Sequence, residues 1–153
     1  MEKSKKNSRY RRIFEQLQPL MRKSSDPLAR MATIAAVLHY KMDYFFWTGF
    51  YLLLNGELVV QVYQGPLACL VLQQHTGVCW AAIDGQQSVV VSDIHLFPGH
   101  IACDSRSLSE IVIPVRNYIN DIIGVLDVDS EILGSFDETD THWLEKIVAL
   151  IYA

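Results

Sequence analysis

The stretch that decides the fold is FFWTGFYLLLNGELVVQVY, residues 45–63. Aromatic, aliphatic and β-branched residues fill both halves, and Asn55-Gly56 lies between them. Asn-Gly readily adopts the two positive-φ conformations of the tight turn that joins antiparallel strands. The sequence therefore predicts a β-hairpin, with strands at residues 45–54 and 57–63.

Further short strands follow this hairpin. Gly65-Pro66 ends its second strand, and we expect extended pieces at residues 67–72 and 88–91 with a short helix over 77–83. Two more apolar runs, residues 110–115 and 122–128, pair across a turn at 117–121. Strands linked by hairpins form an antiparallel sheet.

Helical patterns flank the strands at both ends of the chain. Apolar residues recur at spacings of three and four before residue 22, although Pro19 argues against one unbroken helix there. Ser25-Asp26-Pro27 begins a second helix over 28–40, and Asp137 caps a final one. The order predicts an α+β fold, a central antiparallel sheet with the N- and C-terminal helices packed on one side. Terminal helices of this kind often pair between subunits, so we expect a homodimer.

The length of 153 residues suits one domain spanning residues 1–153. The net charge of −4 is not the basic footprint of a nucleic-acid-binding protein. Lysines and arginines gather within the first 23 residues. We interpret residues 1–9 as a mobile basic tail and the rest of the run as a solvated helix face; an arm for an acidic partner is the alternative.

No apolar stretch approaches the roughly 20 residues that a membrane span needs. The basic N-terminus is not followed by the apolar run and cleavage site of a secretory signal. Three cysteines, an odd number, suit a secreted disulfide framework poorly. We therefore expect a cytoplasmic protein that binds neither membrane nor nucleic acid.

The three cysteines differ in their surroundings. Cys103 lies in the long irregular stretch 93–109, and loops of that length are usually functional or mobile. Cys79 lies in an apolar run that suits a small buried thiol, and Cys69 follows the Gly-Pro break. A zinc site would need His100 or His95 as a fourth ligand, and no close C-x-x-C pair favours it.

Cys103 is the best candidate nucleophile of the three. Only a thiolate attacks well, and His100 could lower the pKa of Cys103. Asp104 and Glu110 would raise it, so the sequence leaves the sign of the pKa shift open.

Carboxylates and aromatic residues supply a possible binding site. Asp127 and Asp129 are two positions apart, so on a strand they share a face; with Glu110 they could bind an ammonium group or hold a proton for donation. The alternative is that the two aspartates merely end the strand in water. Trp47 and Tyr51 share a face if Gly49 is accommodated between them, and they are either core or the wall of a small pocket.

These features occur together in a known family. The chain resembles the free methionine-R-sulfoxide reductases, single-domain enzymes of the GAF fold, over residues 10–150. The matching runs, in chain order, are FWTGFY (46–51), GPLAC (65–69), GVC (77–79), FPGHIACD (97–104), SEIVIP (109–114), GVLDVDS (124–130) and FD (136–137). The FPGHIACD run is far more specific than a general GAF pattern.

The resemblance implies a thiol-dependent reduction of free L-methionine (R)-S-oxide to methionine. Cys103 would attack the sulfoxide, with Cys79 as the rival nucleophile, and Cys69 would resolve the sulfenic acid by forming a disulfide. Thioredoxin would then reduce that disulfide, and neither a metal nor an organic cofactor is implied.

The binding residues follow from the same resemblance. Glu110, Asp127 and Asp129 would form the acidic substrate pocket, and Trp47 with Tyr51 its aromatic wall. Trp80 departs from the family pattern, which has glycine after the second cysteine. The alternative function is a GAF-type sensor module that binds a small molecule without catalysis.

Overall fold

Within the described part of the chain, residues 1–100 and 103–153 of a computed structural model, six strands form one antiparallel sheet in the order β3-β2-β1-β6-β5-β4. The strands are β1 (Trp47–Leu54), β2 (Glu57–Gln64), β3 (Val71–Leu72), β4 (Val89–Val91), β5 (Ser109–Arg116) and β6 (Ile122–Ser130). The helices are α1 (Lys3–Met21), α2 (Pro27–Lys41), α3 (Gly77–Gly85) and α4 (Glu138–Val148), with a 3₁₀ turn η1 (Ile94–Leu96). The predicted α+β arrangement is confirmed.

The hairpin of β1 and β2 forms as predicted. Asn55 and Gly56 have φ angles of 53° and 81°, the positive values that the tight turn between two strands requires. The second predicted pair, β5 and β6, is joined by residues 117–121. Residues 93–100 and 103–108 are irregular apart from η1, and Ile101 and Ala102 of that predicted loop lie outside the described residues.

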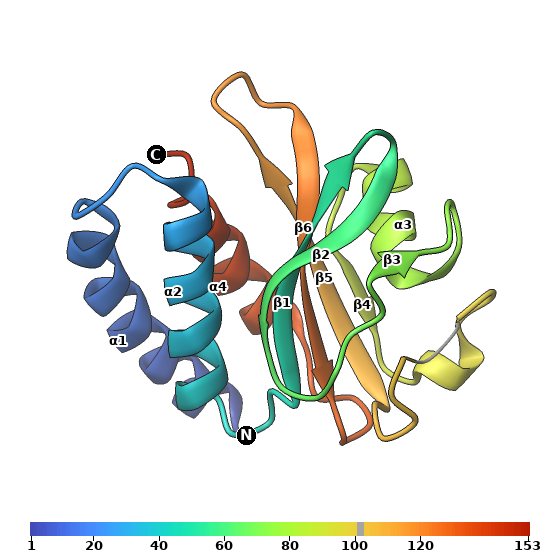
Figure 1. Cartoon of the computed structure of the whole chain (residues 1–153). Coiled ribbons are helices and arrows are strands. Elements are labelled where there is room, and N and C mark those ends of the chain that lie inside the picture. The colour runs from blue at the N-terminus through green and yellow to red at the C-terminus, as the bar shows by residue number, and fades with distance from the viewer. Residues whose placement is uncertain (101–102) are drawn as a thin grey trace.

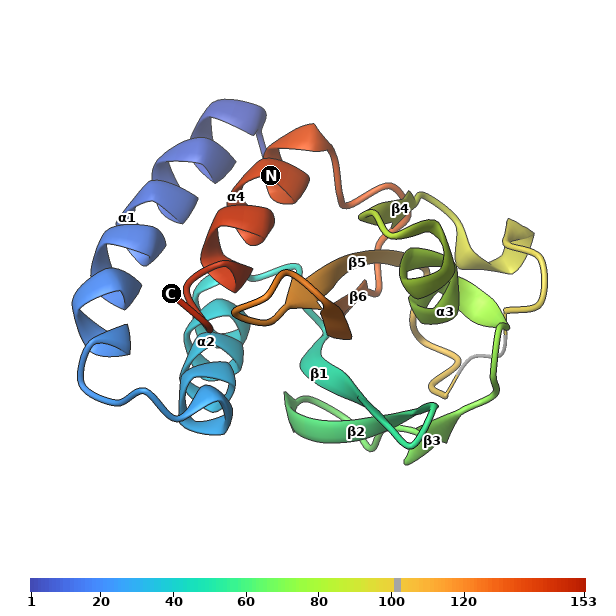
Figure 2. The same ribbon diagram turned by 90° about the horizontal axis from the view of Figure 1, so that it is seen from above.

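The sheet separates two apolar cores. The helices α1, α2 and α4 cover one face, as Figures 1 and 2 show, and the side chains of Phe50, Leu126 and Ile111 point into the core between them. The helix α3 covers the other face, where Tyr51, Val125 and Val112 point. Alternate residues of each strand therefore serve different cores. The terminal helices share one side, as predicted.

Helix caps follow the sequence signals. Asp26 accepts a hydrogen bond from the Leu28 amide at the start of α2. At the start of α4, Asp137 and Asp140 form a capping box, in which each side chain accepts a hydrogen bond from the backbone N–H of the other residue. These contacts set where the two helices begin. No helix of the described residues is long and apolar enough to cross a membrane.

The N-terminus differs from the predicted mobile tail at residues 1–9. Helix α1 begins at Lys3, and the side chain of Lys6 is only 3% exposed. The Lys6 ammonium donates to the Ser135 carbonyl at 2.7 Å and to the Asp140 carboxylate at 2.6 Å. An ion pair with a distant residue therefore orders this segment. The expectation that Pro19 interrupts the helix is also wrong, because α1 runs through it to Met21.

Candidate active site

A cavity of about 240 Å³ opens on the α3 side of the sheet. Its walls come from β1, β5 and β6, from the start of α3, and from the loops that follow β2 and η1. All eight residues that the sequence predicts for the site line this cavity, namely Trp47, Tyr51, Cys69, Cys79, Cys103, Glu110, Asp127 and Asp129. Segments up to 82 positions apart thus converge on one space, the separation between Trp47 and Asp129.

Strand register gathers the three carboxylates. Asp129 lies between Trp47 on β1 and Glu110 on β5, and Asp127 lies one pleat further along the same face of β6. Glu110 and Asp127 are 5% and 6% exposed. The alternative in which the aspartates end the strand in water is therefore wrong for Asp127.

Burial changes the chemistry of these carboxylates. It raises the pKa of Glu110, Asp127 and Asp129, and the neighbouring carboxylates raise the pKa of Glu110 and Asp129 further. Three like charges in one buried space repel one another, so the cluster favours holding a proton. The Oδ1 atom of Asp127 is buried and has no hydrogen-bond partner. The cluster can thus both donate a proton and accept from a cationic ligand.

Stacked aromatic rings form an adjacent wall, because Trp47 on β1 pairs with Asp129 on β6. The Trp47 ring stacks on Tyr51 at a centroid distance of 5.7 Å and on Tyr63 at 5.3 Å. The Trp47 indole donates to the Pro66 carbonyl at 3.0 Å, and the Tyr51 hydroxyl donates to the Cys69 carbonyl at 3.4 Å. Both hydrogen bonds attach the Cys69 loop to β1. This wall can hold an apolar or weakly cationic group.

Gly49 makes this stacking possible. A Cβ atom at position 49 would lie 2.4 Å from the Tyr63 Cβ and 2.6 Å from the Trp47 ring. The register between β1 and β2 also shifts between Gly49 and Tyr51. A glycine with a bulge therefore lets Trp47 fold across the strand. Sequence reasoning missed Tyr63 as a member of the stack, because the hairpin turn alone would pair Gly49 with Val62 and the bulge shifts that pairing to Tyr63.

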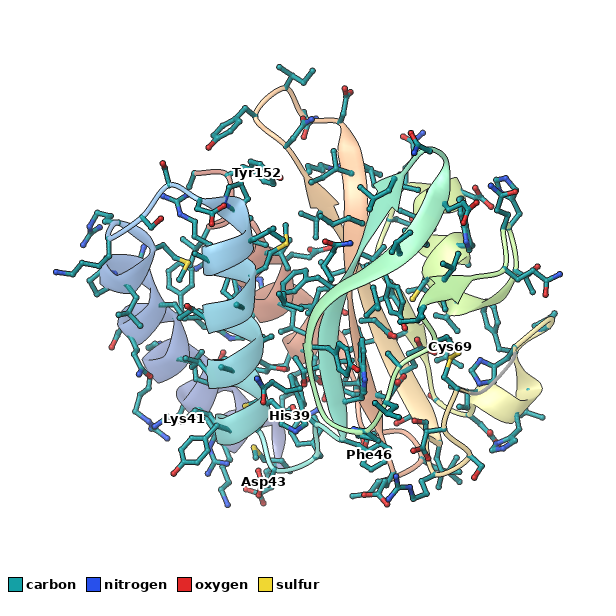
Figure 3. All side chains as sticks on the ribbon, viewed as in Figure 1. His39, Lys41, Asp43, Phe46, Cys69 and Tyr152 are labelled. Carbon is teal, nitrogen blue, oxygen red and sulfur yellow. A yellow bond between two sulfur atoms is a disulfide. The ribbon has the colours of Figure 1, made fainter. Side chains whose placement is uncertain are left out.

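Cys69 and Cys103 form a disulfide, with their Cα atoms 5.6 Å apart. The two residues are 34 positions apart in the chain. Cys69, labelled in Figure 3, lies on the side of the sheet away from α1, α2 and α4. Cys103 is exposed and Cys69 half-buried. The disulfide therefore lies where a small molecule in the cavity and an external reductant can both reach it.

Cys79 is a free thiol beneath the disulfide-bearing loops. It is buried, and its Sγ lies within 4.8 Å of carboxylate oxygens of Glu110 and Asp127. Burial raises the pKa of the Cys79 thiol, and the negative charges of Asp127 and Glu110 raise it further. The thiol is therefore held protonated, which opposes nucleophilic attack.

The structure also bears on the zinc site and on Trp80, both of which the sequence raised. The zinc site, which the sequence did not favour, would need three free cysteines, and the disulfide occupies two of them. His95 does not line the cavity and instead contacts Asp93 at 3.3 Å. Trp80, which departs from the family pattern, also does not line the cavity; its ring lies 4.6 Å from that of His75.

Comparisons with known proteins find similar GAF-domain proteins and free methionine-R-sulfoxide reductases. The chain is 42% identical over 150 residues to GAF domain-containing protein A of Dictyostelium discoideum, covering 97% of this chain and 94% of the relative. It is 42% identical over 130 residues to the free methionine-R-sulfoxide reductase of Escherichia coli K12, covering 85% and 78%. A scan against models of protein families found no match.

Similar solved structures include free methionine-R-sulfoxide reductases. The free methionine-R-sulfoxide reductase of Neisseria meningitidis, in complex with its substrate, superposes with a TM-score of 0.88 at 42% identity, covering 93% of this chain and 85% of that one. The reduced Staphylococcus aureus enzyme gives 0.88 at 39% identity, covering 93% and 92%. Fold and site define a GAF-domain protein with a disulfide at the mouth of an acidic pocket. By these similarities, the chain belongs to the free methionine-R-sulfoxide reductase family.

Proposed function

We propose that this chain reduces free L-methionine (R)-S-oxide to L-methionine. The observation that carries the proposal is the Cys69–Cys103 disulfide on the wall of a cavity that also holds three buried carboxylates. Relatives with the same runs of residues carry the name of this activity. A sensor module would need the cavity but not the paired cysteines.

The first step uses one cysteine and one proton. In the reduced enzyme the Cys103 thiolate attacks the sulfoxide sulfur, while a protonated carboxyl of Glu110 or Asp129 donates to the sulfoxide oxygen. The oxygen passes to the cysteine sulfur and the thioether leaves. Overall, one thiol and one sulfoxide become one sulfenic acid and one methionine.

Two further reactions return Cys103 to its thiol form. The Cys69 thiol condenses with the sulfenic acid on Cys103, which forms the disulfide and releases water. Thioredoxin then reduces the disulfide by thiol exchange, so its own dithiol becomes the disulfide. This cycle needs no metal or organic cofactor. A homodimer and a cytoplasmic location stay predictions from the sequence.

The cavity matches a free amino acid better than a residue within a peptide. Its buried carboxylates suit an α-ammonium group, which a residue inside a chain lacks. Its aromatic wall of Trp47 and Tyr51 suits the S-methyl group. A volume of about 240 Å³ is small and fits one amino acid.

Coupled turnover tests the proposal. With thioredoxin, thioredoxin reductase and NADPH, free methionine (R)-S-oxide should drive NADPH oxidation, and the S epimer should not. The absence of turnover with either epimer, in the presence of dithiothreitol as well, would exclude the reductase. Tight binding of a small molecule without turnover would instead support the sensor module.

Replacing Cys69 with serine should separate the two steps. The variant should release one equivalent of methionine and then stop, because the thiol that resolves the sulfenic acid on Cys103 is gone and either the sulfenic acid or a substitute disulfide with Cys79 remains. Rapid quench with product chromatography measures the burst, and a sulfenic-acid-specific nucleophile detects the trapped species by mass. Sustained turnover with thioredoxin at the wild-type rate would show that Cys69 is not the resolving residue.

A further inference from the structure

Cys79 is a buried thiol that the proposed cycle does not use. It lies in the first turn of α3, lines the cavity and is 5% exposed. Because Cys69 and Cys103 share a disulfide, Cys79 is the free cysteine of the chain. A thiol that faces a cavity can bind a soft or borderline metal ion, in addition to its part in packing.

Two carboxylates lie beside this thiol. The Sγ atom of Cys79 and carboxylate oxygens of Glu110 and Asp127 all lie within 4.8 Å of one another. The three side chains come from α3, β5 and β6, so elements of regular structure hold them in place. In a tetrahedral zinc site the ligand atoms lie roughly 3–4 Å apart, given their bond lengths to the ion. Small side-chain rotations would therefore bring these three groups to bonding distance of one ion.

A second, independent observation shows that this group of side chains lacks a partner. Asp127 is 6% exposed, and its buried Oδ1 atom has no hydrogen-bond partner. Among the described residues that line the cavity, none is a lysine or an arginine. A buried carboxylate oxygen without a partner costs free energy. A cation bound at this place would supply both the missing partner and the missing positive charge.

One sulfur and two oxygen ligands suit zinc. Magnesium and calcium ions prefer oxygen ligands alone, whereas zinc accepts cysteine together with aspartate and glutamate. All three groups line the cavity, so a fourth tetrahedral position is left for a water molecule from the cavity. This site differs from the zinc site raised by the sequence, because it uses Cys79 and leaves the disulfide intact.

We propose that Cys79, Glu110 and Asp127 form an inhibitory site for a zinc ion. On binding, the ion displaces the proton of the thiol and any proton shared by the two carboxyl groups, and no oxidation state changes. Zinc occupies carboxylates that the proposed function assigns to the substrate, so the ion and methionine sulfoxide exclude each other. The metal site does not depend on the proposed function; only its inhibitory effect rests on that function.

Cadmium absorption tests the site in the oxidised chain, where Cys79 is the free thiol. A cadmium–thiolate bond absorbs in the ultraviolet, so ions held only by surface histidines or carboxylates do not contribute to the band. Titration with Cd²⁺ should produce a band that saturates at one ion per chain, and added Zn²⁺ should remove the band by displacing Cd²⁺. Excess Mg²⁺ should leave the band unchanged. The absence of the band in the oxidised chain would overturn the proposal.

Three variants distinguish the proposed site from a lone thiol. Cys79→Ser should abolish the band, and Asp127→Asn should weaken the affinity for Cd²⁺ by at least about tenfold, because a direct ligand is lost. His75→Gln is the matched control and should leave the affinity unchanged, since His75 is exposed, contacts Asp84 and does not line the cavity. Circular dichroism checks that each variant is folded. Equal affinity in Asp127→Asn and the wild type would show that the thiol binds alone, and would overturn the proposal.

A single-turnover assay tests the inhibition and separates it from the proposed function. The reduced chain is freed of dithiothreitol, which would bind zinc, and methionine release is measured with and without Zn²⁺. At low substrate, Zn²⁺ at ten times its dissociation constant should lower the wild-type rate about tenfold, and excess methionine sulfoxide should restore it.

Each variant is compared with its own rate without metal. Cys79→Ser should lose the sensitivity to zinc; equal inhibition of this variant would place the ion on Cys69 and Cys103 and overturn the inhibitory site. If neither epimer is reduced but the cadmium band appears as expected, the reductase fails and the metal site stands. If turnover occurs and the band is absent, the reductase stands and the metal site fails.

Discussion

Serine at position 103 is expected to lower the rate of methionine release in a single turnover by about a thousandfold or more. A hydroxyl is far less acidic than a thiol and cannot accept the sulfoxide oxygen as a sulfenic acid does. The experiment mixes the reduced Cys103→Ser chain with excess free methionine (R)-S-oxide, without further reductant, and measures methionine by chromatography. Circular dichroism checks that the variant is folded.

The matched variant Cys79→Ser distinguishes the two candidate nucleophiles. The buried Cys79 thiol, held protonated beside Asp127 and Glu110, should be replaceable with loss of less than tenfold in the first turnover. If Cys79→Ser blocks the first turnover and Cys103→Ser does not, the assignment of the nucleophile is reversed. The structure favours Cys103, because it already shares a bond with Cys69 and is exposed.

Alanine at position 140 is expected to lower the free energy of unfolding by about 3–5 kcal/mol, the cost of leaving a buried charge without its partner. Asp140 is 0% exposed and accepts from the Lys6 ammonium and the Tyr10 hydroxyl, each at 2.6 Å, and from the Tyr44 hydroxyl at 2.5 Å. For a chain of this size, the melting temperature should fall by about 6–20 °C. Urea denaturation and differential scanning calorimetry measure the two quantities.

A surface ion pair provides the control. Lys3 pairs with Glu138 between the same two helices, but both side chains are exposed. Glu138→Ala should therefore leave the melting temperature nearly unchanged, because water and salt screen the charges. A melting temperature for Asp140→Ala equal to that of the wild type would show that the buried network does not hold α1 against α4.

Local signals explain why much of the fold was predictable. Asn55-Gly56 specifies one turn, Asp26 and Asp137 specify two helix starts, and each acts within a few residues of itself. Strand parity placed Asp127 and Asp129 on one face without knowledge of the partner strands. The family resemblance supplied the pairing of Cys69 with Cys103, which spacing alone could not.

Contacts between residues far apart in the sequence explain where the predictions from the sequence were wrong. Lys6 lies in a basic run that indicated a solvated tail, yet its partner Asp140 is 134 positions away. His100 lines the cavity, although the sequence indicated it only as a zinc ligand and for its effect on the pKa of Cys103.

The disulfide also couples the oxidation state of the chain to its resistance to unfolding. A bond between positions 34 apart removes chain entropy from the unfolded state, a difference of about 3–4 kcal/mol in the loop-closure model. The segment that it closes includes β3, α3 and β4. Each catalytic cycle would thus alternate between an oxidised form that resists unfolding and a reduced form that unfolds more readily. Heat and proteases should act mainly on the reduced, reactive form. When reductant is scarce, the oxidised form accumulates and the inactive protein is protected from unfolding.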